Sequence, residues 1–153
     1  MTAYQLTVPA DNVPGKIARI TSVLNREKVN IRAITISSFG EKGFFNILVD
    51  DPKAAQKALE KEGIAVELKE VIAVLIDDRP GGLDGLAQLL AKNSINVENA
   101  YGFVLESHKN AVFVVDVDRK DMDKTLNLLK DRKFKTLNAE AVATIEPFHY
   151  MKY

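Results

Sequence analysis

Apolar residues along the chain follow two spacings, one typical of helices and one typical of strands. Residues 17, 20 and 24 are apolar at the i, i+3, i+7 spacing of one helix face, and residues 83, 86 and 90 repeat that spacing. Upstream, Tyr4, Leu6 and Val8 alternate with polar residues, as in a half-buried strand, whereas residues 71–76 are continuously apolar. Each half is therefore expected to open with a strand and a helix packed on a sheet.

The two halves of the sequence match one another at a constant offset of 66 positions. The offset places Pro14-Gly15 on Pro80-Gly81, brings the three apolar helix positions together, and pairs Val29-Asn30-Ile31 with Ile95-Asn96-Val97. A match that spans a loop, a helix and a strand entry indicates two structural copies.

The rest of each half predicts a hairpin, a second helix and a closing strand. Turns at 40–43 and 107–110 separate extended stretches at 30–38 and 44–49, and at 96–105 and 111–117. Pro52 is expected to begin one second helix, and residues 121–129 to form the other with Met122, Leu126 and Leu129 inward. Residues 64–68 and 139–145 are expected to be the fourth strands.

The resulting order is βαββαβ twice, which predicts the α+β class, as two ferredoxin-like sandwiches in tandem. Each would have two helices on one face of a four-stranded antiparallel sheet. The domains are expected at residues 1–70 and 71–153, the second with a short aromatic tail at 147–153. No Gly, Pro or Ser separates the halves near residue 70, so the connection is expected to be rigid.

Composition narrows the classes of function. Basic and acidic residues both number 21, so the chain lacks the basic field that nucleic-acid binding needs. There is no cysteine, which excludes thiolate metal sites and is compatible with a reducing cytosol. The longest apolar run, residues 71–76, is too short to cross a bilayer, and we expect a cytoplasmic protein.

The loop from Asp78 to Leu83 is the main candidate for chemistry. Pro80 is expected to be the first helical residue, with Arg79 before it, so that the N–H groups of Gly81, Gly82 and Leu83 would be open to an anionic ligand such as a carboxylate. The alternative is that Asp78 caps the helix and Pro-Gly is only a turn.

The same segment resembles the opening of an ACT domain, an amino-acid-sensing regulatory domain. The resemblance lies in the strand, the Asp78-Arg79-Pro80-Gly81 loop, the helix and Ser94-Ile95-Asn96-Val97, and it returns as Asn12-Val13-Pro14-Gly15 and Val29-Asn30-Ile31. It covers residues 4–70 and 71–146. ACT domains typically pair side by side and bind an amino acid at the shared edge.

The resemblance implies ligand contacts in both halves. They fall on Asp78, Gly81, Gly82, Leu83 and Asn96 in the second half, and on Asn12, Gly15, Lys16, Ile17 and Asn30 in the first. Loop amides would hold the carboxylate, and Asp78 or Asn12 would accept from the ammonium. Alternatively, Asn30 and Asn96 form strand-entry turns at positive φ. The second half ranks first, because it has Gly82 where the first has Lys16.

No catalytic, cofactor or metal site is expected. His108 falls in a hairpin turn and His149 in the tail, and the acidic residues at 50–51 and 116–123 lie around helix starts. We therefore expect a regulatory protein that binds a free amino acid and controls a partner, for example an amino-acid metabolic enzyme. The alternatives are a structural dimerisation module, or a small ferredoxin-like hydrolase.

A homodimer is expected from the second half. Its strands at 71–76 and 111–115 are apolar at consecutive positions, so both faces of the sheet should be covered, although helices cover only one. A second copy of the chain is the simplest cover.

Overall fold

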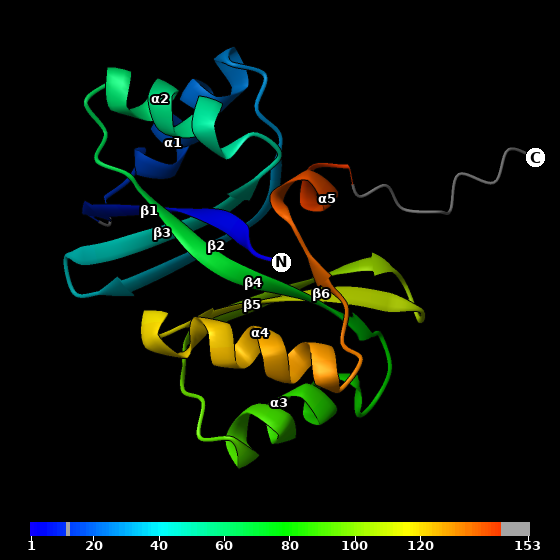
Figure 1. Cartoon of the computed structure of the whole chain (residues 1–153). Helices are drawn as coiled ribbons and strands as arrows, with labels where there is room; N and C mark the ends of the chain where they lie inside the picture. The colour runs from blue at the N-terminus through cyan, green and yellow to red at the C-terminus, as the bar shows by residue number, and fades with distance from the viewer. Residues whose placement is uncertain (12, 145–153) are drawn as a thin grey trace, which may run out of the picture. The chain divides into compact units, whose positions relative to one another are not determined.

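The computed structural model describes residues 1–11 and 13–144 (Figure 1). The chain divides into two compact units, one comprising Tyr4–Glu70 and the other comprising Met1–Ala3 with the described residues from Val71 onward. Strand β4 (Glu67–Asp77) crosses the boundary between them. Asn12, one of the sequence-predicted ligand residues, and the aromatic tail at 147–153 with His149 lie outside the described residues.

The first unit is a four-stranded antiparallel sheet with two helices on one face (Figure 1). Its elements are β1 (Ala3–Asp11), α1 (Lys16–Arg26), β2 (Ile31–Phe39), β3 (Lys42–Val49), α2 (Pro52–Lys61) and the beginning of β4. The strands lie in the order β2-β3-β1-β4. Ile20, Val23 and Leu24 of α1 join the core, but Ile17 stays 42% exposed, so the predicted helix face is right except for its first position.

The second unit repeats this plan and adds two short helices. The rest of β4 is followed by α3 (Gly82–Lys92), β5 (Val97–Glu106), β6 (Asn110–Val117), η1 (Arg119–Asp121), α4 (Met122–Asp131), β7 (Thr136–Leu137) and α5 (Ala139–Ala143). The strand order is β7-β4-β6-β5, with antiparallel neighbours. This arrangement confirms the predicted fold class, two ferredoxin-like βαββαβ sandwiches in tandem.

The fourth strands differ from the sequence prediction. Residues 64–68 were expected to form one strand and 71–76 another, but β4 runs unbroken from Glu67 to Asp77. The predicted strand at 139–145 is wrong: residues 139–143 form α5, and position 145 lies outside the described residues. The reason is local, because the Asn138 side chain accepts a hydrogen bond from the Ala141 N–H at 2.7 Å and so caps an alanine-rich helix.

Helices α1 to α4 all end in the same hydrogen-bonded turn, with one residue in the left-handed conformation. That residue is Lys28, Gly63, Ser94 or Lys133, with φ between 56° and 76°. After α3, for example, the Ser94 and Ile95 N–H groups donate to Ala91 and Leu90 at 3.1 and 3.0 Å. This is a Schellman motif, in which the next residue is apolar and turns back to the core. Three of the four turns place a residue with a Cβ where glycine fits best.

The sheet face opposite the helices of the second unit is also buried. Ile72, Val74 and Val115 belong to the core under the helices, whereas Ala73 and Val114 alternate with them and are at most 1% exposed. These side chains are buried in the single chain, so covering them does not by itself require a second copy.

Ser94→Gly is expected to stabilise the protein by about 0.5–1 kcal/mol. Glycine adopts the left-handed conformation without the steric cost of a Cβ, and this gain exceeds the backbone entropy that glycine loses on folding. Gly63→Ala, at the same position after α2, is expected to destabilise it by about 1 kcal/mol. Urea unfolding of both variants measures the difference. A Ser94→Gly variant less stable than the original chain would contradict the interpretation.

Candidate functional site

A glycine in the left-handed conformation precedes the first helix of each unit. Gly15 and Gly81 have φ of 90° and 88°, and no side chain caps either helix. Helix α3 therefore begins at Gly82, two residues later than the Pro80 expected from the sequence. The Gly82 N–H donates to Arg79 O at 3.0 Å within the turn, so this amide is not open to a ligand as expected.

Asp78 holds the neighbouring hairpin and does not cap the helix. Its Oδ2 accepts from the His108 N–H at 2.7 Å, and its own N–H donates to Lys109 O at 3.1 Å. His108 lies in the β5–β6 turn at φ 66°, so the carboxylate fixes a backbone in the left-handed region. The alternative that Asp78 caps α3 is wrong, because the only side-chain acceptor bond resolved for it goes to the hairpin.

Gly82 is required by the chain's own packing. A Cβ at this position would lie 2.1 Å from Asp77 O, which no real side chain tolerates, whereas a Cβ at Gly85 would meet nothing within 4 Å. The start of α3 thus lies directly against the end of β4. The equivalent residue in the first unit is Lys16, so that helix start keeps more distance from its strand.

A cleft of about 910 Å³ opens at this point of the second unit. Its walls are the β4–α3 loop, the first turn of α3, the β5–β6 turn and the segment that follows α4. The lining residues are Leu75, Ile76, Asp77, Arg79, Pro80, Gly81, Gly82, Gly85, Lys109, Asn110, Arg132, Lys133, Phe134 and Lys135. The lining therefore carries five basic side chains and one acidic one.

The structure brings together only part of the sequence-predicted set in the second unit. Gly81 and Gly82 line the cleft, whereas Asp78, Leu83 and Asn96 do not. Leu83 is 44% exposed on the first turn of α3, and Asn96 is exposed before β5. Leu83 thus leaves apolar surface beside the loop. Asn96 precedes the start of β5, which pairs with the end of β6, whereas the loop follows Asp77, which pairs with the start of β6, so Asn96 and the loop lie at opposite ends of the sheet.

The predicted set of the first unit is more dispersed. Lys16 lines a pocket of about 180 Å³ with Arg19 and Gly63, and it also borders a second one of about 350 Å³ at Lys42. Gly15, Ile17 and Asn30 line neither pocket. The Asn30 N–H donates to Asp50 Oδ1 at 3.0 Å.

Neither Asn30 nor Asn96 supports the alternative of a strand-entry turn at positive φ. Both asparagines have ordinary negative φ, and the left-handed residues are Lys28 and Ser94, two positions earlier. That alternative is therefore wrong.

The basic residues of the cleft were missed by the sequence reasoning. Arg132, Lys133 and Lys135 follow α4, and Lys109 lies in the β5–β6 turn. The sequence does contain a cluster of basic residues at 130–135, which could have indicated an anion site. Only the fold shows that this cluster lies beside the loop before α3.

Other chemistry finds no support in the part of the chain that the structure describes. No group of three or more His, Asp or Glu residues lies within reach of a common metal ion, and no helix is long and apolar enough to cross a membrane.

Burial, followed by the negative charge of Asp116, raises the pKa of Tyr101, so that its hydroxyl stays neutral.

The two units, each with a helix that begins after a left-handed glycine and packs on a four-stranded antiparallel sheet, define a pair of ferredoxin-like α+β domains. Residues 1–146 match the family of ACT domain pairs, and the chain belongs to that family. The predicted resemblance is thus confirmed over nearly the whole sequence. No curated protein matches the sequence.

Solved structures extend this result. A protein from Bacteroides thetaiotaomicron is 28% identical, with a TM-score of 0.86 over 94% of this chain and 97% of that one. The ligand-free regulatory subunit of aspartate kinase from Thermus thermophilus is 16% identical, with a TM-score of 0.60 over 87% and 97%. The corresponding subunit from Thermus flavus is also 16% identical, with a TM-score of 0.56 over 85% and 91%. The last two similarities show the shared fold.

Gly82→Ala and Gly85→Ala are expected to have opposite effects on stability. The first forces a Cβ against Asp77 O and should cost about 1–3 kcal/mol. The second fills open space and improves helix propensity, for a gain of up to about 1 kcal/mol. Urea unfolding gives the free energy of unfolding for the same substitution at two positions of one helix. Equal changes in the two variants would contradict the close approach of Gly82 to Asp77 O.

Proposed function

We propose that this chain is a non-catalytic regulatory protein that binds a free amino acid and controls a partner enzyme of amino-acid metabolism. Membership of the ACT domain pair family supports the regulatory part. The observation that carries the ligand part is the loop before α3, where Gly81 and Gly82 open onto a cleft. Regulatory subunits of aspartate kinase share the fold, and they suggest the class of partner.

The second unit is proposed as the working site. Its cleft is about 910 Å³, whereas the equivalent region of the first unit holds two smaller pockets of about 180 and 350 Å³. Asp78 uses Oδ2 on the hairpin, which leaves Oδ1 to accept from a ligand ammonium. Leu83 would contact an apolar ligand side chain. Asn96 lies at the opposite end of the sheet of its own unit, so its amide would bind the carboxylate or the ammonium from a paired copy of the chain.

An amino acid that binds is expected to raise the melting temperature. At about 100 times its dissociation constant it adds about 2.7 kcal/mol, which corresponds to roughly 5–11 °C for a chain of this length. A thermal-shift screen of the twenty amino acids identifies it. A flat response to all twenty would contradict amino-acid binding and favour a structural module.

The amino acid found in the screen also locates the site. Asp78→Asn keeps an acceptor for the His108 N–H but removes the charge, so we expect affinity to fall about ten- to a hundred-fold. Asn96→Ala is expected to weaken binding, whereas its first-unit counterparts, Asn30→Ala and Asn12→Ala, serve as controls. Calorimetry in which the first-unit variants lose binding and the second-unit variants keep it would place the working site in the first unit.

A homodimer is part of the proposal, and the edge strand β2 of the first unit is its most suitable surface. Ile36 and Phe39 on this strand are 47% and 85% exposed, and the strand has a neighbour on one side only. Exposed apolar side chains on an open sheet edge are a template for pairing with another strand.

Light scattering at micromolar concentration is expected to return twice the chain mass of 17.0 kDa. Ile36→Lys combined with Phe39→Lys should shift the protein to the monomer, because charges on an edge strand oppose pairing. Ser22→Lys, which adds a charge on the exposed side of α1, should leave the mass unchanged. A monomeric original chain would refute the dimer.

A further inference from the structure

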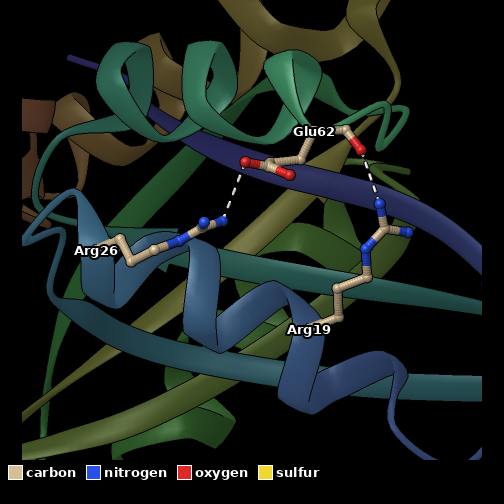
Figure 2. A network of polar contacts seen from close by, with 3 residues as sticks. All are labelled: Arg19, Arg26 and Glu62. Carbon is tan, nitrogen blue, oxygen red and sulfur yellow. Dashed lines mark hydrogen bonds and ion pairs between the residues drawn. The ribbon is translucent and has the colours of Figure 1, made fainter.

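The region of the first unit that corresponds to the cleft is largely filled by side chains. Comparing the two units shows which residues differ there. In the first unit the Arg19 Nη2 donates to Glu62 O at 2.7 Å, and Arg26 Nη2 lies 3.1 Å from Glu62 Oε1 (Figure 2). Glu62 is the residue that ends α2. The side chains of α1 thus cross to the end of α2, where a pocket of about 180 Å³ remains, apart from the one of about 350 Å³ at Lys42.

The equivalent positions in the second unit reverse this arrangement. The offset of 66 places Gly82 at Lys16 and Gly85 at Arg19, so these two positions at the start of α3 have no side chain that could reach the end of α4. The residue that ends α4 is Arg132, where the first unit has Glu62. Its neighbours Lys133 and Lys135 occupy the places of Gly63 and Ala65. The second unit thus lacks the two cations at the start of the first helix, keeps one at its end, with Lys92 in place of Arg26, and has three more beyond the second helix.

These three cations have no partner among the described residues. Within the cleft, Arg79 is paired with Asp77 at 2.8 Å, and Lys109 is paired with Glu106. Arg132, Lys133 and Lys135 form no hydrogen bond or ion pair through their side chains in the described part of the chain. Three like charges beside one open volume repel one another, and an anion from solution would relieve that repulsion.

We propose that this cleft binds a small organic anion with at least two negative charges, carried by phosphoryl or carboxylate groups. The amino acid of the proposed function would contact the loop before α3, whereas these three cations lie after α4. Its single carboxylate would neutralise only one of them, so a separate ligand with at least two negative charges suits the group better. The volume of about 910 Å³ is that of a pocket for a small molecule rather than for a single ion. The proposal does not rest on amino-acid binding, because its residues lie after α4.

Calorimetry with pyrophosphate and citrate tests the proposal. We expect saturable binding of at least one probe, with one site per chain, and weaker binding as ionic strength rises from about 0.01 M to about 0.15 M. Binding of pyrophosphate alone would indicate a phosphoryl ligand, and binding of citrate alone would indicate a polycarboxylate. Binding of both would indicate a site that accepts clustered negative charge of either kind. Binding of neither probe would overturn the proposal.

The discriminating variant is Lys133→Gly, with Lys28→Gly as its control. Both lysines are exposed, and each adopts the left-handed conformation just after a helix. Glycine removes the steric cost of a Cβ in that conformation, so neither variant is expected to lose its fold. Only Lys133 lines the cleft. We expect Lys133→Gly to weaken binding of the probe about ten-fold or more and Lys28→Gly to leave it unchanged. Equal losses in the two variants would show unspecific attraction and overturn the site.

Asn96→Ala separates this proposal from the proposed function. It should leave pyrophosphate and citrate binding unchanged while it weakens binding of the amino acid. If Asn96→Ala abolished both, the anion would occupy the amino-acid site, and a separate anion site would be refuted.

Discussion

The left-handed glycine before the first helix is the constraint on which the site depends. Gly15 and Gly81 have nearly identical backbone angles, with φ of 90° and 88° and ψ of −11° and −13°. An added Cβ would meet nothing within 4 Å at either position, so the conformation and not the available space demands glycine. This turn sets where the helix starts relative to the strand before it. In the second unit the result is contact between Gly82 and the last residues of β4.

The two units therefore share one backbone fold but differ in the residues around the start of their first helix. The core of each unit needs only apolar residues at matching positions, and Ile20 and Leu86 satisfy this need equally well. The charged residues around the cleft are outside that constraint, because they do not belong to the core. Exchanging Arg19 for Gly85 and Glu62 for Arg132 leaves the fold intact and converts a filled, internally paired site into an open cationic one.

Much of the fold was predictable from the sequence, because its signals are local and repeated. The constant offset identified two copies, and Pro52 marked the start of α2 correctly. The missed elements are those in which a local hydrogen bond outweighs the pattern, as at Asn138, where a cap converts an expected strand into a helix. The cleft was only half predictable. Its glycines lie in a recognisable loop, whereas Arg132 and Lys133 lie about fifty positions further on, and only the antiparallel packing of the helices brings them there.

The polar contacts between the helices explain how the second unit keeps its cleft open. In the first unit, Arg19 and Arg26 both reach Glu62 and so tie α1 to the end of α2. In the second unit, Lys124 in the first turn of α4 donates to Asn93 O, at the end of α3, at 2.8 Å. The helix pair is thus tied at the opposite end. Because the contact has moved, no polar side-chain contact among the described residues joins the start of α3 to the end of α4, and the two helices meet there over the apolar core. The basic residues that follow α4 are consequently left at the mouth of the cleft, where their charges face solvent and any anion that enters.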